Sequence, residues 1–372
     1  MFEPIRESVY RPKIAVIGVG GAGCNAINHM IEAGLTDVKF YAMNTDIQAL
    51  ERSKAEHKIQ LGPNLTRGLG SGGDPEIGRK AAEESMEQIK EILAELDMIF
   101  IAAGEGGGTG TGASPLISAL AQNLGILTVA VVTKPFSIEG LLRKRNAEIG
   151  ISELRDHVDT LIVIPNDKIL SVAPKGTPVK KAFKLADDVL CNATKAIADL
   201  ITKPGIINLD FADVKAVMGY RGNAIIGIGM AKGETRAKDA AEKAVASPLI
   251  EDFDITGAKG VLINISGGED LALDEAVEAA KIVQQSVSKD ALILYGISED
   301  AVSDGEIRVT VIATGIEDIA RKPSGVETLM PSSQDTFDIP AFVRMKKNME
   351  VKRKFDKEDL DIPAFLRKQE EE

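Results

Sequence analysis

Short apolar runs alternate with amphipathic stretches along most of the chain. In the first half, apolar runs occupy residues 14–17, 38–43, 98–103, 126–132 and 161–164, with stretches of helical periodicity between them. Strands that alternate with helices favour a doubly wound α/β fold built on a parallel sheet. The pattern therefore predicts a parallel-sheet domain over residues 13–178, preceded by a flexible N-terminus of residues 1–12.

A long helix is predicted to follow this domain, over residues 179–203. Apolar side chains recur there at steps of three and four residues, at Phe183, Ala186, Leu190, Ala193, Ile197, Leu200 and Ile201. Pro204 and Gly205 end the pattern. Further strands are predicted at residues 224–230, 261–266, 291–297 and 307–314, and further helices at 234–246 and 273–288. We interpret residues 204–320 as a second, smaller α/β domain.

The end of the chain has a different composition. Beyond residue 320 it is rich in Pro, Ser, Lys, Asp and Glu without periodicity, which predicts a linker over 321–336 and a disordered tail over 337–372. One segment of the tail is repeated, because FDIPAFVR at 337–344 returns as LDIPAFLR at 360–367. Two copies of one apolar pattern favour two partner-binding segments, each a short helix that begins at its Asp. The candidate partner-binding residues are Asp338, Ile339, Pro340, Phe342, Asp361, Ile362, Pro363, Phe365, Leu366 and Arg367.

Composition and charge narrow the class of protein. Apolar residues make up 44% of the 372 residues, enough for sizeable cores, and 44 basic against 56 acidic residues leave a net charge of −12. This charge argues against nucleic acid as a partner. The two cysteines, Cys24 and Cys191, are too few for a disulfide framework, and no apolar run is long enough to cross a bilayer. These features predict a cytoplasmic protein without direct membrane insertion.

Three clusters of glycine are candidates for phosphate-binding loops. The first, Gly18-x-Gly20-x-x-Gly23, follows a predicted strand and opens a predicted helix, which is typical of a loop that contacts a pyrophosphate. A Rossmann NAD site, with Asp46 on the ribose, fits this loop equally well.

The second and third clusters favour a nucleoside triphosphate. Residues 104–112 read GEGGGTGTG after another predicted strand, and residues 68–73 read GLGSGG. Successive unhindered amides and threonine hydroxyls suit a terminal phosphate, although each cluster taken alone is also compatible with a simple tight turn. The chain contains no Gly-Lys dipeptide, so a Walker A loop is excluded and backbone amides must hold the phosphates.

Three motifs together resemble the FtsZ family, the bacterial tubulin homologues of cell division. They are Gly-Gly-Gly-Thr-Gly-Thr-Gly at 106–112, Asn-Thr-Asp at 44–46 and Asn-Leu-Asp-Phe-Ala-Asp at 208–213. The likeness extends from about Lys13 to Gly315 and returns in the tail, with Cys24 at a position that is often glycine and with the tail segment doubled. The resemblance implies an N-terminal GTPase domain, a central helix and a C-terminal domain.

The resemblance also implies residues for the binding of GTP or GDP. It implies that the first loop uses Gly20, Gly21, Ala22, Gly23, Cys24 and Asn25, that Asn44, Asp46 and Gly72 lie near the phosphates, and that Gly107, Gly108, Thr109 and Gly110 wrap the terminal phosphates. It implies that Glu139 and Arg143 are the ribose and phosphate contacts and that Asn166 faces the nucleoside. It also implies that Phe183 stacks on the base and that Asp187 recognises its edge. A carboxylate can accept from both N1–H and N2–H of guanine, which favours GTP over ATP. Plain core packing is the alternative for Phe183.

Catalysis is implied for a second region of the chain. By the resemblance, Asn208, Asp210 and Asp213 act on the nucleotide of a neighbouring subunit, with Mg²⁺ held mainly through phosphate oxygens and without a separate protein metal site. Without the resemblance, two acids near a helix start would simply complement its dipole. The resemblance also implies that copies of this chain form a head-to-tail filament, which assembles into a ring at the division site under the inner membrane. It implies that the tail binds membrane-tethering adaptors and division regulators. An NAD-dependent oxidoreductase and a non-catalytic nucleotide-binding scaffold are the two alternatives.

Overall fold

The computed structural model describes residues 12–172, 176–202, 210–247, 255–299 and 305–316. All of them belong to the first of two compact units, Met1–Arg321. Asn208, the linker and both tail segments lie outside the described residues. Predictions that rest on them therefore stay predictions.

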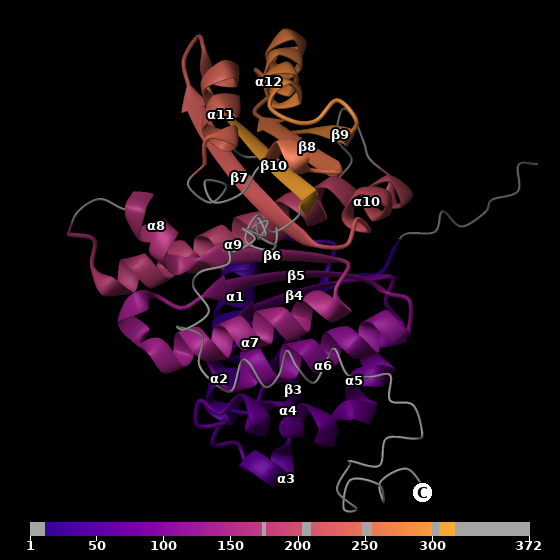
Figure 1. Cartoon of the computed structure of the whole chain (residues 1–372), viewed down its shortest axis with the longest axis vertical. Coiled ribbons are helices and arrows are strands. Elements are labelled where there is room, and N and C mark those ends of the chain that lie inside the picture. Colours follow the sequence, from indigo (N-terminus) through magenta and orange to yellow (C-terminus); the bar gives the residue numbers. More distant parts are fainter. Residues whose placement is uncertain (1–11, 173–175, 203–209, 248–254, 300–304, 317–372) are drawn as a thin grey trace, which may run out of the picture. The chain divides into compact units, whose positions relative to one another are not determined.

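Ten strands of the described chain form one sheet in the order β3-β2-β1-β4-β5-β6-β7-β10-β8-β9 (Figure 1). In chain order they are β1 (Ile14–Val19), β2 (Lys39–Asn44), β3 (His57–Gln60), β4 (Met98–Gly104), β5 (Leu127–Lys134), β6 (Thr160–Pro165), β7 (Asn223–Lys232), β8 (Gly260–Gly267), β9 (Leu292–Glu299) and β10 (Glu306–Ile316). The pairs from β3 to β6 are all parallel. This confirms the predicted parallel sheet of the first half.

Twelve α-helices accompany the sheet in the described residues. They are α1 (Gly20–Glu32), α2 (Ile47–Arg52), α3 (Pro63–Thr66), α4 (Pro75–Glu84), α5 (Met86–Leu93), α6 (Thr109–Asn123), α7 (Leu141–His157), α8 (Asn166–Val172), α9 (Val179–Thr202), α10 (Phe211–Met218), α11 (Arg236–Val245) and α12 (Leu273–Gln285). None of the helices in the described part is both long and apolar enough to cross a membrane.

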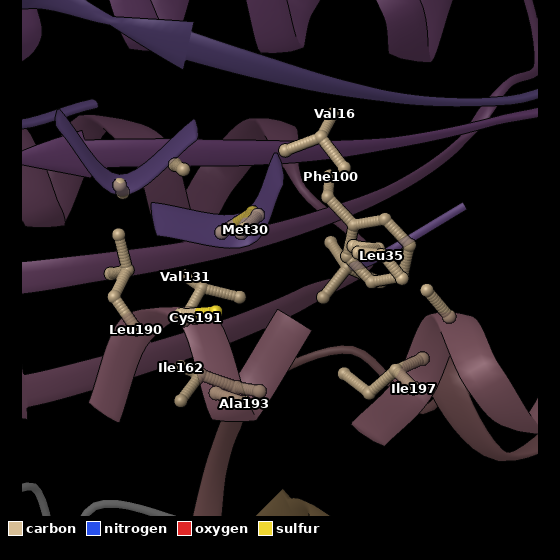
Figure 2. Packing of buried hydrophobic residues seen from close by; sticks show 14 of the residues in the cluster. Val16, Met30, Leu35, Phe100, Val131, Ile162, Leu190, Cys191, Ala193 and Ile197 are labelled. Atoms are coloured by element: carbon tan, nitrogen blue, oxygen red, sulfur yellow. The ribbon is translucent and has the colours of Figure 1, made fainter. Parts of the chain in front are cut away.

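The strands β1, β2, β4, β5 and β6 are buried on both faces. Alternate residues of each strand point to opposite faces, so Val16 and Phe100 belong to one core and Ile17 and Ile101 to the other. The first core lies against α1 and α9, where Met30 and Ile197 approach the strands (Figure 2). The second core lies against α4, α5, α6 and α7. Helices on both faces make this sheet doubly wound, as predicted.

The last four strands carry a separate core. Strand β7 joins the parallel strands through two residue pairs, Leu161 with Asn223 and Ile162 with Ala224. Strand β10 runs antiparallel to both β7 and β8, whereas β8 and β9 are parallel. Helices α11 and α12 cover one face of these strands (Figure 1), and the first core continues onto the other face, where α9 and α10 contribute. The C-terminal part thus combines a smaller, mixed sheet with helices. The exact domain boundaries stay a prediction.

Candidate nucleotide-binding site

All three glycine clusters line one cavity of about 620 Å³. Two of them follow β1 and β4, which are neighbours in the sheet and end at the same edge. The loops touch each other, because a Cβ on Gly20 would lie 2.9 Å from the amide nitrogen of Gly110. Gly20 also has a φ of +73°, a conformation that side chains other than glycine's rarely adopt. The glycines therefore let two backbone loops approach closely around a shared space.

Two helices begin at this cavity without a side-chain cap. Helix α1 has Val19 and helix α6 has Gly108 at the N-cap position, and neither side chain accepts from the first turn. By contrast, Asp46, Asp74 and Asp210 cap the starts of α2, α4 and α10. The first amides of α1 and α6 therefore remain available as donors, and both helix dipoles favour an anion there. This arrangement suits the phosphates of a nucleotide.

Three buried hydroxyl groups add to the polar lining. The Oγ1 atoms of Thr45 and Thr109 lie 2.6 Å apart, and the Ser71 Oγ lies 3.1 Å from the same Thr109 oxygen. Of these three residues, only Thr109 is among the predicted nucleotide-binding residues. The 64- and 38-residue separations of the other two from Thr109 gave no local signal.

The loop after β5 carries a fixed pair of charges. Glu139 accepts from the Phe136 amide at 2.9 Å and pairs with Arg143 at 2.7 Å. Nearby, Asn166 is buried, and its side-chain oxygen has no hydrogen-bond partner within the described residues. Since an orphaned acceptor in a cavity calls for a donor, this end of the site suits a polar ligand.

An aromatic ring and an acid from α9 border the same space. The Phe183 ring meets the buried Phe136 ring edge-on, with centroids 5.0 Å apart, and stays 43% exposed. Asp187 lies one turn further along the helix, and burial raises the pKa of its carboxyl to about 6. At neutral pH it is therefore chiefly an acceptor. A partly exposed ring beside an acceptor can hold a planar base with donor groups on its edge.

Sixteen of the predicted nucleotide-binding residues line this cavity. They are Gly20, Gly21, Ala22, Asn25, Asn44, Asp46, Gly72, Gly107, Gly108, Thr109, Gly110, Glu139, Arg143, Asn166, Phe183 and Asp187. Gly23 and Cys24 lie behind this lining, both buried. A Cβ on Gly23 would lie 2.3 Å from the Ala102 carbonyl oxygen, so this glycine permits the close approach of α1 to β4. The cavity is also lined by residues that were not predicted to bind the nucleotide, among them Thr45, Ser71, Glu105 and Thr133.

The two predicted catalytic acids lie elsewhere. Asp210 is exposed at the start of α10, where its carboxylate accepts from the Asp213 amide at 2.7 Å. Neither acid lines the glycine cavity. In the described part of the chain, no group of three or more His, Cys, Asp and Glu side chains is placed to hold a metal ion.

Comparison with known proteins agrees with this geometry. Residues 13–174 match the GTPase domain of the Tubulin/FtsZ family, and residues 222–317 match the C-terminal domain of the FtsZ family. An FtsZ dimer from M. jannaschii is 48% identical, with a TM-score of 0.80 over 84% of this chain and 90% of that one. The chain belongs to the tubulin/FtsZ family. It is thus a tubulin-like GTPase. The matched GTPase domain supplies the whole lining of the cavity except Phe183, Ala186 and Asp187 of α9.

A second structural likeness concerns the fold alone. CetZ2 from Haloferax volcanii, solved as a protofilament with GTPγS, is 22% identical, with a TM-score of 0.68 over 82% of this chain and 93% of that one. The tubulin/FtsZ fold is therefore kept while most residues change. The 48% identity to the M. jannaschii FtsZ is what ties this chain to FtsZ within the family.

Proposed function

We propose that this chain binds GTP, polymerises head to tail into filaments, and hydrolyses GTP where two subunits meet. The proposal rests on the distance between the glycine cavity and the acidic turn, which we define as Asp210 to Asp213 at the start of α10. Phe183 lines the cavity near the start of α9, and Thr202 ends the helix. At 1.5 Å per residue, about 28 Å of helix separates these two residues. Asp210 follows only eight residues after Thr202, counted from the sequence numbers.

The opposite edges of the parallel sheet support the same separation. The cavity lies at the carboxyl ends of β1 and β4. Helix α10 ends instead at the amino end of β6, where the Thr160 hydroxyl donates to the Met218 carbonyl oxygen. An acidic turn at one end of the subunit and a nucleotide at the other can meet only between subunits. Such a head-to-tail contact does not close on itself and produces an open filament.

The acids that line the cavity have other tasks. Asp46 caps α2, and Glu139 pairs with Arg143. Glu105 packs against Gly150, and Asp187 lies at the proposed base end. Attack of water on a γ-phosphate depends on positioning and charge stabilisation. We therefore assign that task to Asp210 and Asp213 of the adjacent subunit, together with Asn208.

Exposed apolar side chains near the cavity support its burial in an interface. Leu69 is 85% exposed, Ile138 is 90% exposed and Leu141 is 85% exposed. Leu69 lines the cavity itself, and the other two flank Glu139 and Arg143 in the chain. Large exposed apolar groups beside a binding cavity are typical of an interaction site. The second subunit is the occupant that this proposal assigns to them.

Guanine is the base that this site suits. Phe183 would stack on the purine, and Asp187 would accept from N1–H and N2–H. Mg²⁺ would be held mainly by phosphate oxygens and water, as is usual for this ion. It would neutralise charge that develops on the phosphates.

Membership of the family also supports a proposal for the cellular role. We propose that the filaments form the division ring at mid-cell, in the cytoplasm under the inner membrane. The two tail segments would bind membrane-tethering adaptors, and two copies on one linker would raise the avidity of this contact. Comparing adaptor binding by the intact chain, Phe342→Ala, Phe365→Ala and the double variant tests the last point.

The proposed function is tested by measuring GTP turnover per subunit against protein concentration. We expect turnover to fall away below a threshold concentration, at which sedimentable filaments also disappear. Constant turnover at every dilution would show that each subunit holds a complete active site. Binding of GTP without turnover at any concentration would instead support a nucleotide-binding scaffold.

A further inference from the structure

Thr109 is the meeting point of three loops that are far apart in the sequence. Its hydroxyl contacts Thr45, from the loop after β2, and Ser71, from the third glycine cluster. Thr109 itself is the first residue of α6. All three side chains are buried, with exposed fractions of 0%, 6% and 7% for Thr45, Ser71 and Thr109. All three residues also line the nucleotide cavity.

The number of protons in this cluster matters for its chemistry. Each hydroxyl can donate one hydrogen bond, and the two contacts within the cluster use two of the three protons. One proton is left over in every arrangement of donors. Since the cluster lines the cavity, this proton can be donated to a ligand that only accepts, such as a phosphate oxygen. When Thr45 and Ser71 both donate to Thr109, the free proton is that of Thr109, and the two contacts hold its hydroxyl in place for that task.

The cluster lies far from the proposed ribose contacts. Thr45 follows β2, whereas Glu139 and Arg143 follow β5. The sheet order β2-β1-β4-β5 places these strands three spacings apart, which is about 14 Å. The group of a bound nucleotide that lies nearest the cluster is therefore the phosphoryl group furthest from the ribose.

Ser71 adds a link that the backbone alone does not provide. The third glycine cluster is tied to the loop after β2 by backbone bonds, from Gly70 to Thr45 at 3.2 Å and from Ile47 to Gly68 at 3.1 Å. Its side-chain bond to the second glycine loop is the contact of Ser71 with Thr109. The second loop also packs tightly here, because a Cβ on Gly108 would lie 2.2 Å from the Ser71 Oγ. The Ser71 hydroxyl therefore couples two phosphate-binding loops.

We propose that Thr45 and Ser71 are positioning residues, which hold the Thr109 hydroxyl toward the terminal phosphate and so favour GTP over GDP. This inference rests on the proposed binding of GTP in the cavity. It assigns a preference between nucleotides to two side chains that need not touch the nucleotide themselves.

The test compares two substitutions of Thr45 that separate the hydroxyl from packing. Thr45→Val keeps the side-chain shape and removes the hydroxyl, whereas Thr45→Ser keeps the hydroxyl and removes a methyl group. Dissociation constants for GTPγS and GDP are measured by calorimetry, below the concentration at which filaments form. We expect Thr45→Val to weaken GTPγS binding by about three- to tenfold with little change for GDP. Thr45→Ser should keep the wild-type ratio.

Ser71→Ala provides a second, independent variant. It should lower the preference for GTPγS in the same direction as Thr45→Val. Because both side chains act through Thr109, the double variant should lose less than the product of the two single effects. Thermal unfolding of each variant checks that it folds, and Ser71→Ala decides the matter should Thr45→Val fail to fold.

The outcomes separate this inference from the proposed function. An unchanged ratio of GTPγS to GDP affinity in Ser71→Ala and Thr45→Val overturns the inference alone. A larger effect of Thr45→Ser than of Thr45→Val also overturns it, because packing would then decide the result. A wild-type chain that binds neither nucleotide overturns the proposed function, and the inference with it.

Discussion

The carboxyl group of Glu105 packs against Gly150 of α7. A Cβ on Gly150 would lie 2.5 Å from the Glu105 Oε2, so the acid occupies the place where a larger residue would have its side chain. Neither carboxyl oxygen has a hydrogen-bond partner within the described chain. Burial raises the pKa of Glu105 to about 8; the nearby Thr111 hydroxyl opposes this without reaching hydrogen-bonding geometry, and the negative charge of Glu153 adds to it. The second glycine loop thus contains an acid that is protonated at neutral pH.

Glu105 should make the protein less stable as the pH rises toward 8. An unfolded chain releases this proton near pH 4.5, whereas the native chain keeps it up to about pH 8. Stability from this group is therefore complete below pH 4.5 and is lost as the pH rises to 8, by at most about 1.4 kcal/mol per pH unit. Urea unfolding between pH 6.5 and 8.5 should show this decline, and Glu105→Gln should flatten it. Parallel curves for the two proteins would contradict the assignment.

The pH range starts at 6.5 because Asp187 also makes the protein less stable as the pH rises, but at lower pH. Burial raises the pKa of Asp187 from 3.8 to about 6, so the stability that this group contributes is nearly all lost by pH 6.5. Asp187→Asn serves as the matched control. It should leave the slope above pH 6.5 as in the wild type, while Glu105→Gln reduces it.

Replacing each of two glycines of the first loop by alanine should affect different properties, stability for Gly23 and nucleotide binding for Gly21. Gly23→Ala places a methyl group 2.3 Å from the Ala102 carbonyl oxygen, so α1 must move away from β4. We expect this to lower the free energy of unfolding by about 1 to 3 kcal/mol. Gly21→Ala meets no atom within 4 Å and should keep the stability within about 0.5 kcal/mol. Because Gly21 lines the cavity, its variant should instead weaken nucleotide binding.

Chemical unfolding and nucleotide titration of both variants check this pair. Equal losses of stability would mean that the approach of α1 to β4 adjusts without cost. Loss of nucleotide binding by a fully stable Gly23→Ala would place Gly23 in the binding loop itself.

Much of this arrangement could be predicted from local patterns. Buried parallel strands give continuous apolar runs, so β1 and β4 and the loops after them were found. Strand β3 was missed because it is a short edge strand, His-Lys-Ile-Gln, in which only Ile59 is buried. An edge strand with one buried side chain produces no apolar run.

Two features of the site had no signal in the sequence. A charged residue between glycines, such as Glu105, is normally expected at the surface, and only the packing of α7 buries it. The cluster of Thr45, Ser71 and Thr109 depends on which loops the sheet order brings together. Periodicity predicts elements, whereas contacts between distant loops depend on the tertiary structure.

The preference for guanine should depend on Asp187. Opposite adenine, its carboxylate would face an acceptor and stay unpaired, and an unpaired buried polar group costs about 1 to 3 kcal/mol. Asp187→Ala should therefore weaken GTP binding and narrow the gap between GTP and ATP. Competition titrations with both nucleotides measure this gap. A ratio that stays at the wild-type value would mean that other groups recognise the base.

Asp213 is the cleaner of the two acids for testing catalysis between subunits. Asp210 accepts from the Asp213 amide and caps α10, so removing its side chain would also cost about 1 kcal/mol of stability. Asp213→Ala leaves that cap in place. Since Asp213 would act on the nucleotide of a neighbour, the variant should bind GTP as the wild type does and still assemble. Its turnover should fall by at least about a hundredfold.

Mixing the variant with wild-type chains distinguishes action within a subunit from action between subunits. An acid that serves its own nucleotide predicts activity in proportion to the wild-type fraction. Between subunits, a wild-type neighbour supplies the acid, so the GTP bound to variant chains should be hydrolysed in mixed filaments but not in filaments of the variant alone. GTP content and turnover are therefore measured together in mixed filaments. A variant that fails to bind GTP when it is monomeric would place Asp213 in its own subunit's site and contradict the assignment between subunits.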